Sequence, residues 1–148
     1  MKKGIYALIL RCPAEVSVRI GALGEKSFAA GWYIYVGSAL GSGGLDRVCR
    51  HIRFYRERYR RPKWHIDYLM ERIELTSVIY AATEERLECV LSRAVGGEGI
   101  EGFGCSDCAC GTHLYFRLEN PGEEIRGAFE SIGLCPKELG AGVLKKEG

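Results

Sequence analysis

The stretch Gly31-Trp32-Tyr33-Ile34-Tyr35-Val36-Gly37 is the clearest structural signal in the sequence. Its five central residues are aromatic or β-branched, and a glycine bounds each end. Side chains of this kind pack well on a pleated, half-buried surface, so the stretch predicts a β-strand over residues 32–36. The segments on either side decide which kind of sheet this strand joins.

Two further strands are predicted on the N-terminal side. Ile5–Leu10 is a continuous apolar run between Gly4 and Cys12-Pro13, which is typical of a strand buried on both faces. Val16–Ile20 alternates between apolar and polar residues. We expect this second strand to pair with Trp32–Val36 through the glycine-containing connection between them.

Helices are predicted on the C-terminal side, where a glycine-rich loop at residues 37–44 leads into a segment with apolar residues at helical spacing. This first helix should run from about Leu45 to Tyr59. The later predicted elements are helices over Trp64–Ile73, from Thr83 onward and over Ile125–Ile132, and strands over Ser77–Ala82 and His113–Leu118.

This order of elements predicts an α/β chain of the α+β sandwich type, with a small, mostly antiparallel central sheet flanked by helices. No repeat or linker divides the 148 residues. We therefore expect a single domain over residues 1–148, with its core at about 4–118 and a C-terminal extension at 119–148.

Composition excludes several classes of protein. No apolar run approaches the ~18–20 residues that a membrane span needs, so no membrane partner is expected. The apolar run near the N-terminus stops at Arg11, which favours a strand over a signal peptide. The seven cysteines are odd in number and favour reduced thiols in a cytoplasmic protein.

The net charge of +2 conceals a strong polarity. Residues 1–63 carry 13 basic and 4 acidic side chains, or +9, whereas residues 64–148 carry 8 and 15, or −7. The segment 46–63 alone carries +6, and seven of its eight basic side chains are arginines, which suit bidentate phosphate contacts. The pattern favours an anionic partner on one face, although a solvated arginine-rich helix would give the same count.

Several motifs occur in one order. Gly4-Ile5-Tyr6, a spacer, Tyr35-Val36-Gly37, and then Arg47 and Glu88 on successive helices resemble the GIY-YIG nuclease superfamily. An uncharacterised prokaryotic GIY-YIG-like branch, sometimes fused to endonuclease III, looks like a closer match. The runs that carry this resemblance, which covers roughly residues 4–118, are Tyr35–Ala39, Gly43–Leu45, Arg50-His51, Trp64–Leu69, Glu88-Cys89 and Gly104–Cys108.

The resemblance implies a GIY-YIG-like fold and hydrolysis of phosphodiester bonds. It assigns one divalent cation, Mg²⁺ or Mn²⁺, to Glu88. It implies that Tyr6 or Tyr35 acts as general base or positions the attacking water. It also implies that Arg47 stabilises the charged transition state. His51 lies four residues after Arg47, on the same flank of the predicted helix, and completes the predicted catalytic set.

Nucleic-acid contacts are expected beside this set, with DNA favoured over RNA. Most arginines of the first helix should face solvent, opposite its apolar stripe. The predicted contact residues are Gly37, Ser38, Arg50, Arg53, Arg56, Arg60 and Lys63.

An additional site is predicted at His65, Asp67, Asp107 and His113. His65 and Asp67 would share a face of an extended segment but not of a helix, and a buried, hydrogen-bonded histidine is the alternative. Members of the superfamily often carry an asparagine after the glutamate. Here the only asparagine is Asn120, in a turn.

The cysteine-rich loop admits two interpretations. Cys105, Cys108, Cys110 and His113 together could donate to Zn²⁺. The usual second pair at long spacing is missing, so we favour a glycine-rich turn with small, partly buried thiols.

Three functions are compatible with these observations. The first is a metal-dependent endonuclease in DNA repair or processing. The second is a non-catalytic DNA-binding module, or a degenerate nuclease, that assists a DNA-repair protein. The third is a zinc-stabilised scaffold.

Overall fold

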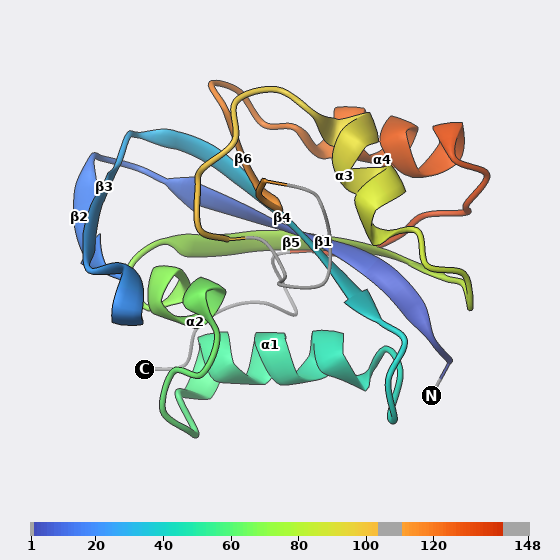
Figure 1. Ribbon diagram of the computed structural model, residues 1–148, viewed down its shortest axis with the longest axis horizontal. Coiled ribbons are helices and arrows are strands. Elements are labelled where there is room, and N and C mark those ends of the chain that lie inside the picture. Colours follow the sequence, from blue (N-terminus) through green and yellow to red (C-terminus); the bar gives the residue numbers. More distant parts are fainter. Residues whose placement is uncertain (1, 104–110, 141–148) are drawn as a thin grey trace.

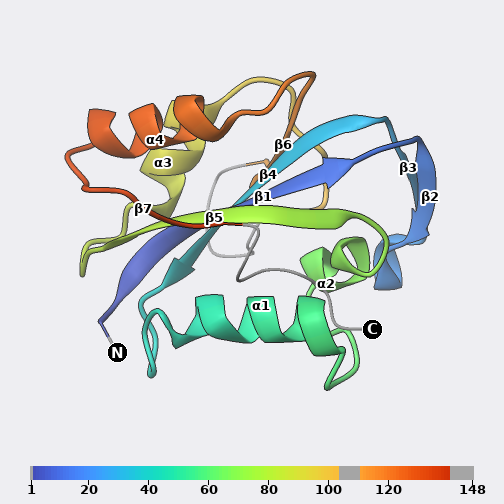
Figure 2. The same cartoon turned by 180° about the vertical axis from the view of Figure 1, so that it is seen from behind.

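A computed structural model describes residues 2–103 and 111–140 of the chain. Its centre is a five-stranded antiparallel sheet in the order β6-β4-β1-β5-β7, with helices on both faces (Figures 1 and 2). The strands of this sheet are β1 (Gly4–Cys12), β4 (Gly31–Ala39), β5 (Glu74–Ala82), β6 (Leu114–Arg117) and β7 (Lys137–Leu139). The predicted α+β sandwich is therefore confirmed.

Two helices cover each face of the sheet. The helices α1 (Asp46–Glu57) and α2 (His65–Met70) lie on one side, and α3 (Glu88–Val95) and α4 (Gly122–Ser131) lie on the other (Figure 1). Alternate residues of β1 enter the two cores that result: Leu8 and Leu10 pack with α1 and α2, whereas Ala7 and Ile9 pack with α3 and α4. Burial on both faces explains why β1 is a continuous apolar run.

A separate hairpin extends from the end of β1. It consists of β2 (Val16–Arg19), the short 3₁₀ helix η1 (Gly21–Leu23) and β3 (Glu25–Phe28). The expected pairing of Val16–Ile20 with Trp32–Val36 is wrong, because all nine residues of β4 pair with β1 on one side. The other side of β4 pairs with β6, so it offers no edge to β2.

Two element boundaries differ from the prediction. Thr83 does not cap a helix: its hydroxyl accepts a hydrogen bond from the backbone N–H of Glu85 in a turn, and α3 begins only at Glu88. The segment expected as a C-terminal extension also belongs to the fold, since Ile125 and Phe129 of α4 are fully buried and β7 pairs with β5.

None of the helices in the described part of the chain has both the length and the apolar composition needed to cross a membrane.

Candidate functional site

The register between β1 and β4 brings the two halves of the motif together. Tyr6 lies directly opposite Gly37, and its ring passes across the glycine toward α1. A Cβ atom at residue 37 would overlap the phenol carbon and oxygen of Tyr6. Gly37 is thus required by close packing, because its missing side chain leaves the space that the Tyr6 ring fills.

The Tyr6 hydroxyl meets a histidine from α1. Its Oη is 2.8 Å from His51 Nε2, and each residue is only 2% exposed. His51 reaches this position because α1 directs Val48, His51 and Ile52 toward the sheet. Two residues that sequence analysis assigned to one site are therefore hydrogen-bonded inside the protein.

Burial keeps both members of this pair neutral. It raises the pKa of Tyr6 well above its usual value of 10, and the nearby Tyr35 adds to the rise. It also lowers the pKa of His51 to about 4. At pH 7 the pair is a phenol hydrogen-bonded to an uncharged imidazole.

Arg47 lies beside this pair at the edge of β4. Its Nη1 donates a 3.1 Å hydrogen bond to the carbonyl oxygen of Ser38. Its charge and a hydrogen bond to Tyr6 favour the ionised phenol, without outweighing burial. The Trp64 ring packs against both helix residues, 5.6 Å from the Arg47 guanidinium and 5.7 Å from the His51 ring. Sequence analysis did not predict this role for Trp64, although the residue lies in the quoted run 64–69.

Glu88 approaches the same region from the far side of β4. It is the first residue of α3, and its Oε2 is 3.1 Å from Nδ1 of the buried His113. The carbonyl of His113 accepts a hydrogen bond from the N–H of Val36, next to the half-buried Tyr35. The charge of Glu88 contributes to the raised pKa of Tyr6, so all five predicted catalytic residues lie in one electrostatic neighbourhood.

Glu88 could bind a divalent cation that needs only one or two ligands from the protein. In the described residues no group of three or more His, Cys, Asp or Glu side chains could form a protein cage. The Glu88 side chain is 22% exposed and is held by His113, so it offers a single oriented carboxylate. Mg²⁺ is commonly bound by one or two carboxylates, with water and substrate phosphate oxygens completing its shell.

His65 and Asp67 do not join this group directly. The segment is helical, so the two side chains diverge: His65 Nδ1 donates to the carbonyl of Gly102 at 2.8 Å. Asp67 is fully buried and accepts hydrogen bonds from the backbone N–H groups of Lys63 and Trp64. Both side chains therefore hold α2 in place.

The basic residues divide into two sets. Arg50 and Arg53 are exposed on the outer side of α1, and Lys63 is exposed beside Trp64. Arg60 does not lie on the solvent face of this helix as expected, because α1 ends at Glu57 and Arg58 adopts a left-handed conformation. The Arg60 guanidinium instead binds Asp67 at 2.8 Å. The remaining predicted arginine, Arg56, is half-buried.

The other predicted residues are easily placed. Cys105, Asp107, Cys108 and Cys110 lie outside the described residues, and His113 is the partner of Glu88. Asn120 is exposed, and its side-chain oxygen accepts a hydrogen bond from the N–H of Gly122. This bond closes the turn before α4, and Asn120 has no contact with Glu88 among the described interactions.

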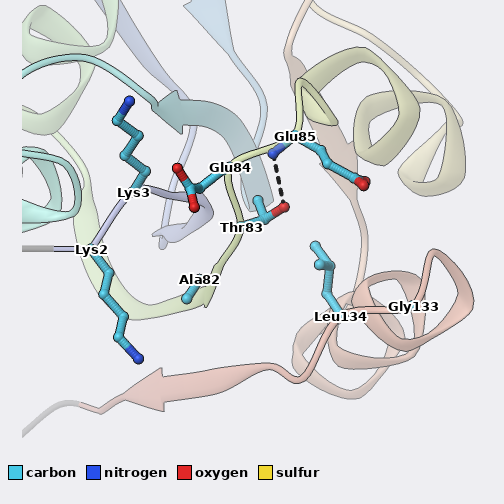
Figure 3. A pocket seen from close by; sticks show the side chains of 8 residues that line it. All are labelled: Lys2, Lys3, Ala82, Thr83, Glu84, Glu85, Gly133 and Leu134. Carbon is cyan, nitrogen blue, oxygen red and sulfur yellow. Dashed lines mark hydrogen bonds between the residues drawn. The ribbon is translucent and has the colours of Figure 1, made fainter.

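A separate open hollow of about 840 Å³ lies where β1 begins and β5 ends. Figure 3 shows that its Lys2 and Lys3 side chains point away from one another and that Glu84 and Glu85 lie on the turn before α3. These dispersed charges converge on no common point, so the Tyr6–His51 neighbourhood is the better candidate site.

Comparison with known proteins gives a family but no described activity. The model of a family described as "Domain of unknown function DUF123" matches residues 5–134, which is most of the chain. The chain therefore belongs to this family. No curated protein and no solved structure matches it.

Proposed function

We propose that this member of the DUF123 family is a metal-dependent endonuclease that hydrolyses phosphodiester bonds in nucleic acid, with DNA favoured over RNA and chemistry of the GIY-YIG type. The observation that carries the proposal is the buried 2.8 Å hydrogen bond between Tyr6 Oη and His51 Nε2. A phenol paired with a neutral imidazole can relay a proton, which is what an attacking water molecule requires.

Because burial raises the pKa of Tyr6, the proposed mechanism begins from the neutral phenol. Tyr6 Oη accepts a proton from the attacking water while its own proton passes to His51 Nε2. The resulting hydroxide oxygen bonds to phosphorus as the bond to the leaving oxygen breaks; the bonding pair stays on the leaving alkoxide, which takes a proton from solvent water. Burial lowers the pKa of His51 to about 4, so the Nε2 lone pair is unprotonated at neutral pH and directed at Tyr6, while the same shift makes the imidazole a weaker base.

Arg47 and Glu88 complete the site in this proposal. The Arg47 guanidinium, fixed by the Ser38 carbonyl, stabilises the negative charge that develops on the phosphoryl oxygens. Glu88, held by His113, is the ligand for Mg²⁺ or Mn²⁺. When bound, such a cation supplies Lewis-acid stabilisation at the phosphoryl and leaving oxygens.

The surface next to the site suits a polyanion. The guanidinium of Arg53 lies 4.1 Å from the ring centre of the exposed Tyr59, and such stacking fixes the plane of the guanidinium. Arg53 Nε also lies 3.6 Å from the carboxylate of Glu57, so phosphate oxygens would be bound through the Nη groups. Arg50 and Lys63 add exposed charges on the same segment.

The test is a nicking assay on supercoiled plasmid and on labelled single-stranded and duplex DNA and RNA, with Mg²⁺, Mn²⁺ or EDTA. We expect cleavage that needs the metal and that falls by at least about 100-fold in Tyr6→Phe and Glu88→Gln. Tyr33→Phe and Glu85→Gln are matched controls, since Tyr33 is another buried tyrosine of the sheet, on β4 beside β1, and Glu85 is exposed. Folded protein that cleaves none of these substrates would contradict the proposal.

A non-catalytic DNA-binding module that assists a DNA-repair partner is the second candidate. One observation favours it: the only asparagine, Asn120, is used in a turn and not beside Glu88. This function predicts salt-dependent binding without turnover, unchanged in Glu88→Gln. A cytoplasmic location is proposed for either function, because the exposed Cys49 and Cys135 are free thiols.

A further inference from the structure

Three buried side-chain nitrogen or oxygen atoms lack a hydrogen-bond partner in the described part of the chain: His51 Nδ1, Asp67 Oδ1 and Arg60 Nη2. Burying a polar atom without a partner is costly, so such atoms in a well-packed core point to an unrecognised interaction. None of the three is explained by the contacts described above.

The three atoms belong to one neighbourhood around Trp64. Asp67 Oδ2 and Arg60 Nη1 are 2.8 Å apart, so the unpartnered Oδ1 and Nη2 belong to the two side chains of a single ion pair. The Trp64 backbone N–H binds that same carboxylate at 3.0 Å. The Trp64 ring lies 5.1 Å from the Arg60 guanidinium and 5.7 Å from the His51 ring.

The role of Asp67 in capping does not account for both of its oxygens. Oδ2 alone accepts the bonds from Arg60, from the N–H of Lys63 and from the N–H of Trp64. Oδ1 accepts none of them, although the side chain is fully buried. If Asp67 only capped α2, its second carboxylate oxygen would be buried without a hydrogen bond, which is energetically costly.

The hydrogen bonds of Tyr6 indicate which nitrogen of His51 carries the proton. The Arg47 guanidinium can only donate hydrogen bonds, so the Tyr6 oxygen is the acceptor in the bond between these two residues. The single phenol proton is then free to be donated to His51 Nε2. A neutral His51 then carries its own proton on Nδ1, and this N–H needs an acceptor. The charged and titratable groups that face His51 are Tyr6 from β1, Arg47 and Arg50 from α1, Arg60 from the following segment and Asp67 from α2. Asp67 is the sole carboxylate among them.

We propose that an internal water molecule joins His51 Nδ1, Asp67 Oδ1 and Arg60 Nη2, and that Asp67 acts through it as a positioning residue that fixes the tautomer of His51. The water accepts from Nδ1–H and from Nη2–H and donates to Oδ1, which satisfies all three atoms at once. Three polar partners are typical of a buried structural water.

This arrangement extends the proton relay, and in that respect it rests on the proposed function. When the proton of Tyr6 moves to His51 Nε2, the imidazole becomes positively charged within the protein. The carboxylate of Asp67 stabilises that charge, and the fixed tautomer keeps the Nε2 lone pair directed at Tyr6. The water keeps both of its protons and no bond to it is broken.

The first experiment measures the tautomer without substrate. Nitrogen-15 NMR of uniformly labelled protein, with His51 assigned by comparison with His51→Gln, distinguishes protonated from unprotonated ring nitrogens. We expect the Nδ1–H tautomer in the wild type and, decisively, in Tyr6→Phe, where only Asp67 remains to fix it. In Tyr6→Phe/Asp67→Asn we expect both tautomers, whereas Tyr6→Phe/Asp46→Asn, in which an exposed aspartate of α1 is neutralised, retains one.

A mixed or Nε2–H tautomer in Tyr6→Phe would overturn the proposal, and this result does not depend on whether the Asp67 variant folds. A crystal structure gives the second check, in which a water molecule should lie within hydrogen-bond distance of all three atoms. Density without that water would overturn the bridge.

The second experiment concerns turnover. In the nicking assay, Asp67→Asn should lower kcat by at least about tenfold and leave KM unchanged, while Asp46→Asn should change neither. If no substrate is cleaved, the proposed function fails, yet the tautomer measured in Tyr6→Phe still decides the role of Asp67. If the wild type cleaves and Asp67→Asn retains full kcat, the relay is wrong and the proposed function stands.

Discussion

Replacing Gly37 with alanine should force the Tyr6 ring away from His51. The added Cβ would overlap the phenol end of Tyr6, and the ring has no free space to enter because it is 2% exposed and held by His51. Overpacking of a core typically costs about 1–3 kcal/mol, and the broken hydrogen bond about 1 kcal/mol. We therefore expect Gly37→Ala to lower the free energy of unfolding by about 2–4 kcal/mol.

A double-mutant cycle in urea identifies the cause. The backbone of Gly37 is not in the left-handed region, so alanine is allowed there once the ring is gone. In a Tyr6→Ala background the substitution should cost nothing, or stabilise β4 by about 0.5–1 kcal/mol. Gly41→Ala is the matched control, since its Cβ would have no neighbour within 4 Å. Equal costs of Gly37→Ala in both backgrounds would refute the reasoning.

Three further predictions concern charge. The pKa of His51 is lower in the folded chain (about 4) than in the unfolded chain (about 6.5), so protonation favours unfolding. The free energy of unfolding should therefore fall by about 3 kcal/mol between pH 6.5 and pH 4. In urea titrations, His51→Gln should lack this part of the loss. Arg60→Ala leaves the buried Asp67 carboxylate without its ion-pair partner and should lower the free energy of unfolding by about 3 kcal/mol, measured by heat or urea. The control Arg50→Ala, at an exposed site, should change it by less than about 0.5 kcal/mol. Similar losses in the two variants would argue against the buried pair. Arg50→Ala/Arg53→Ala should reduce the slope of log K against log salt for DNA binding by about 2, and an unaltered slope would remove this face from the interface.

The sequence predicted best the elements whose own residues carry a long pattern. The strand around residues 32–36 and the helix beginning near Leu45 occur in the structure as β4 and α1. The strands β3 and β7 were missed because each is short and mostly polar, as in Glu25-Lys26-Ser27 and Lys137-Glu138. Their pairing depends on neighbours that the local sequence does not reveal.

The candidate site followed from motif order only in part. Tyr6, Arg47 and His51 were expected together and are in contact or adjacent. The ion pair between Glu88 and His113 could not be predicted from spacing. The two residues are 25 positions apart, and they meet beside β4, where the His113 carbonyl accepts a hydrogen bond from Val36. A buried aspartate in a helical segment likewise gives no local sign that one of its oxygens is unused.

If Tyr6 and His51 form the proposed proton relay, its position beneath α1 explains why a strongly basic segment and an uncharged pair occur side by side. In the proposed function, exposed arginines of α1 such as Arg50 and Arg53 would attract the anionic substrate. The charges of Arg47, Arg60 and Arg50 also lower the pKa of His51. In water, such charges would favour an ionised Tyr6, but burial outweighs them and raises its pKa instead. The low polarity beneath α1 therefore keeps both groups uncharged while the surface above remains cationic. Gly37 is central to this arrangement, because only a residue without a side chain lets the Tyr6 ring lie deep enough to reach His51.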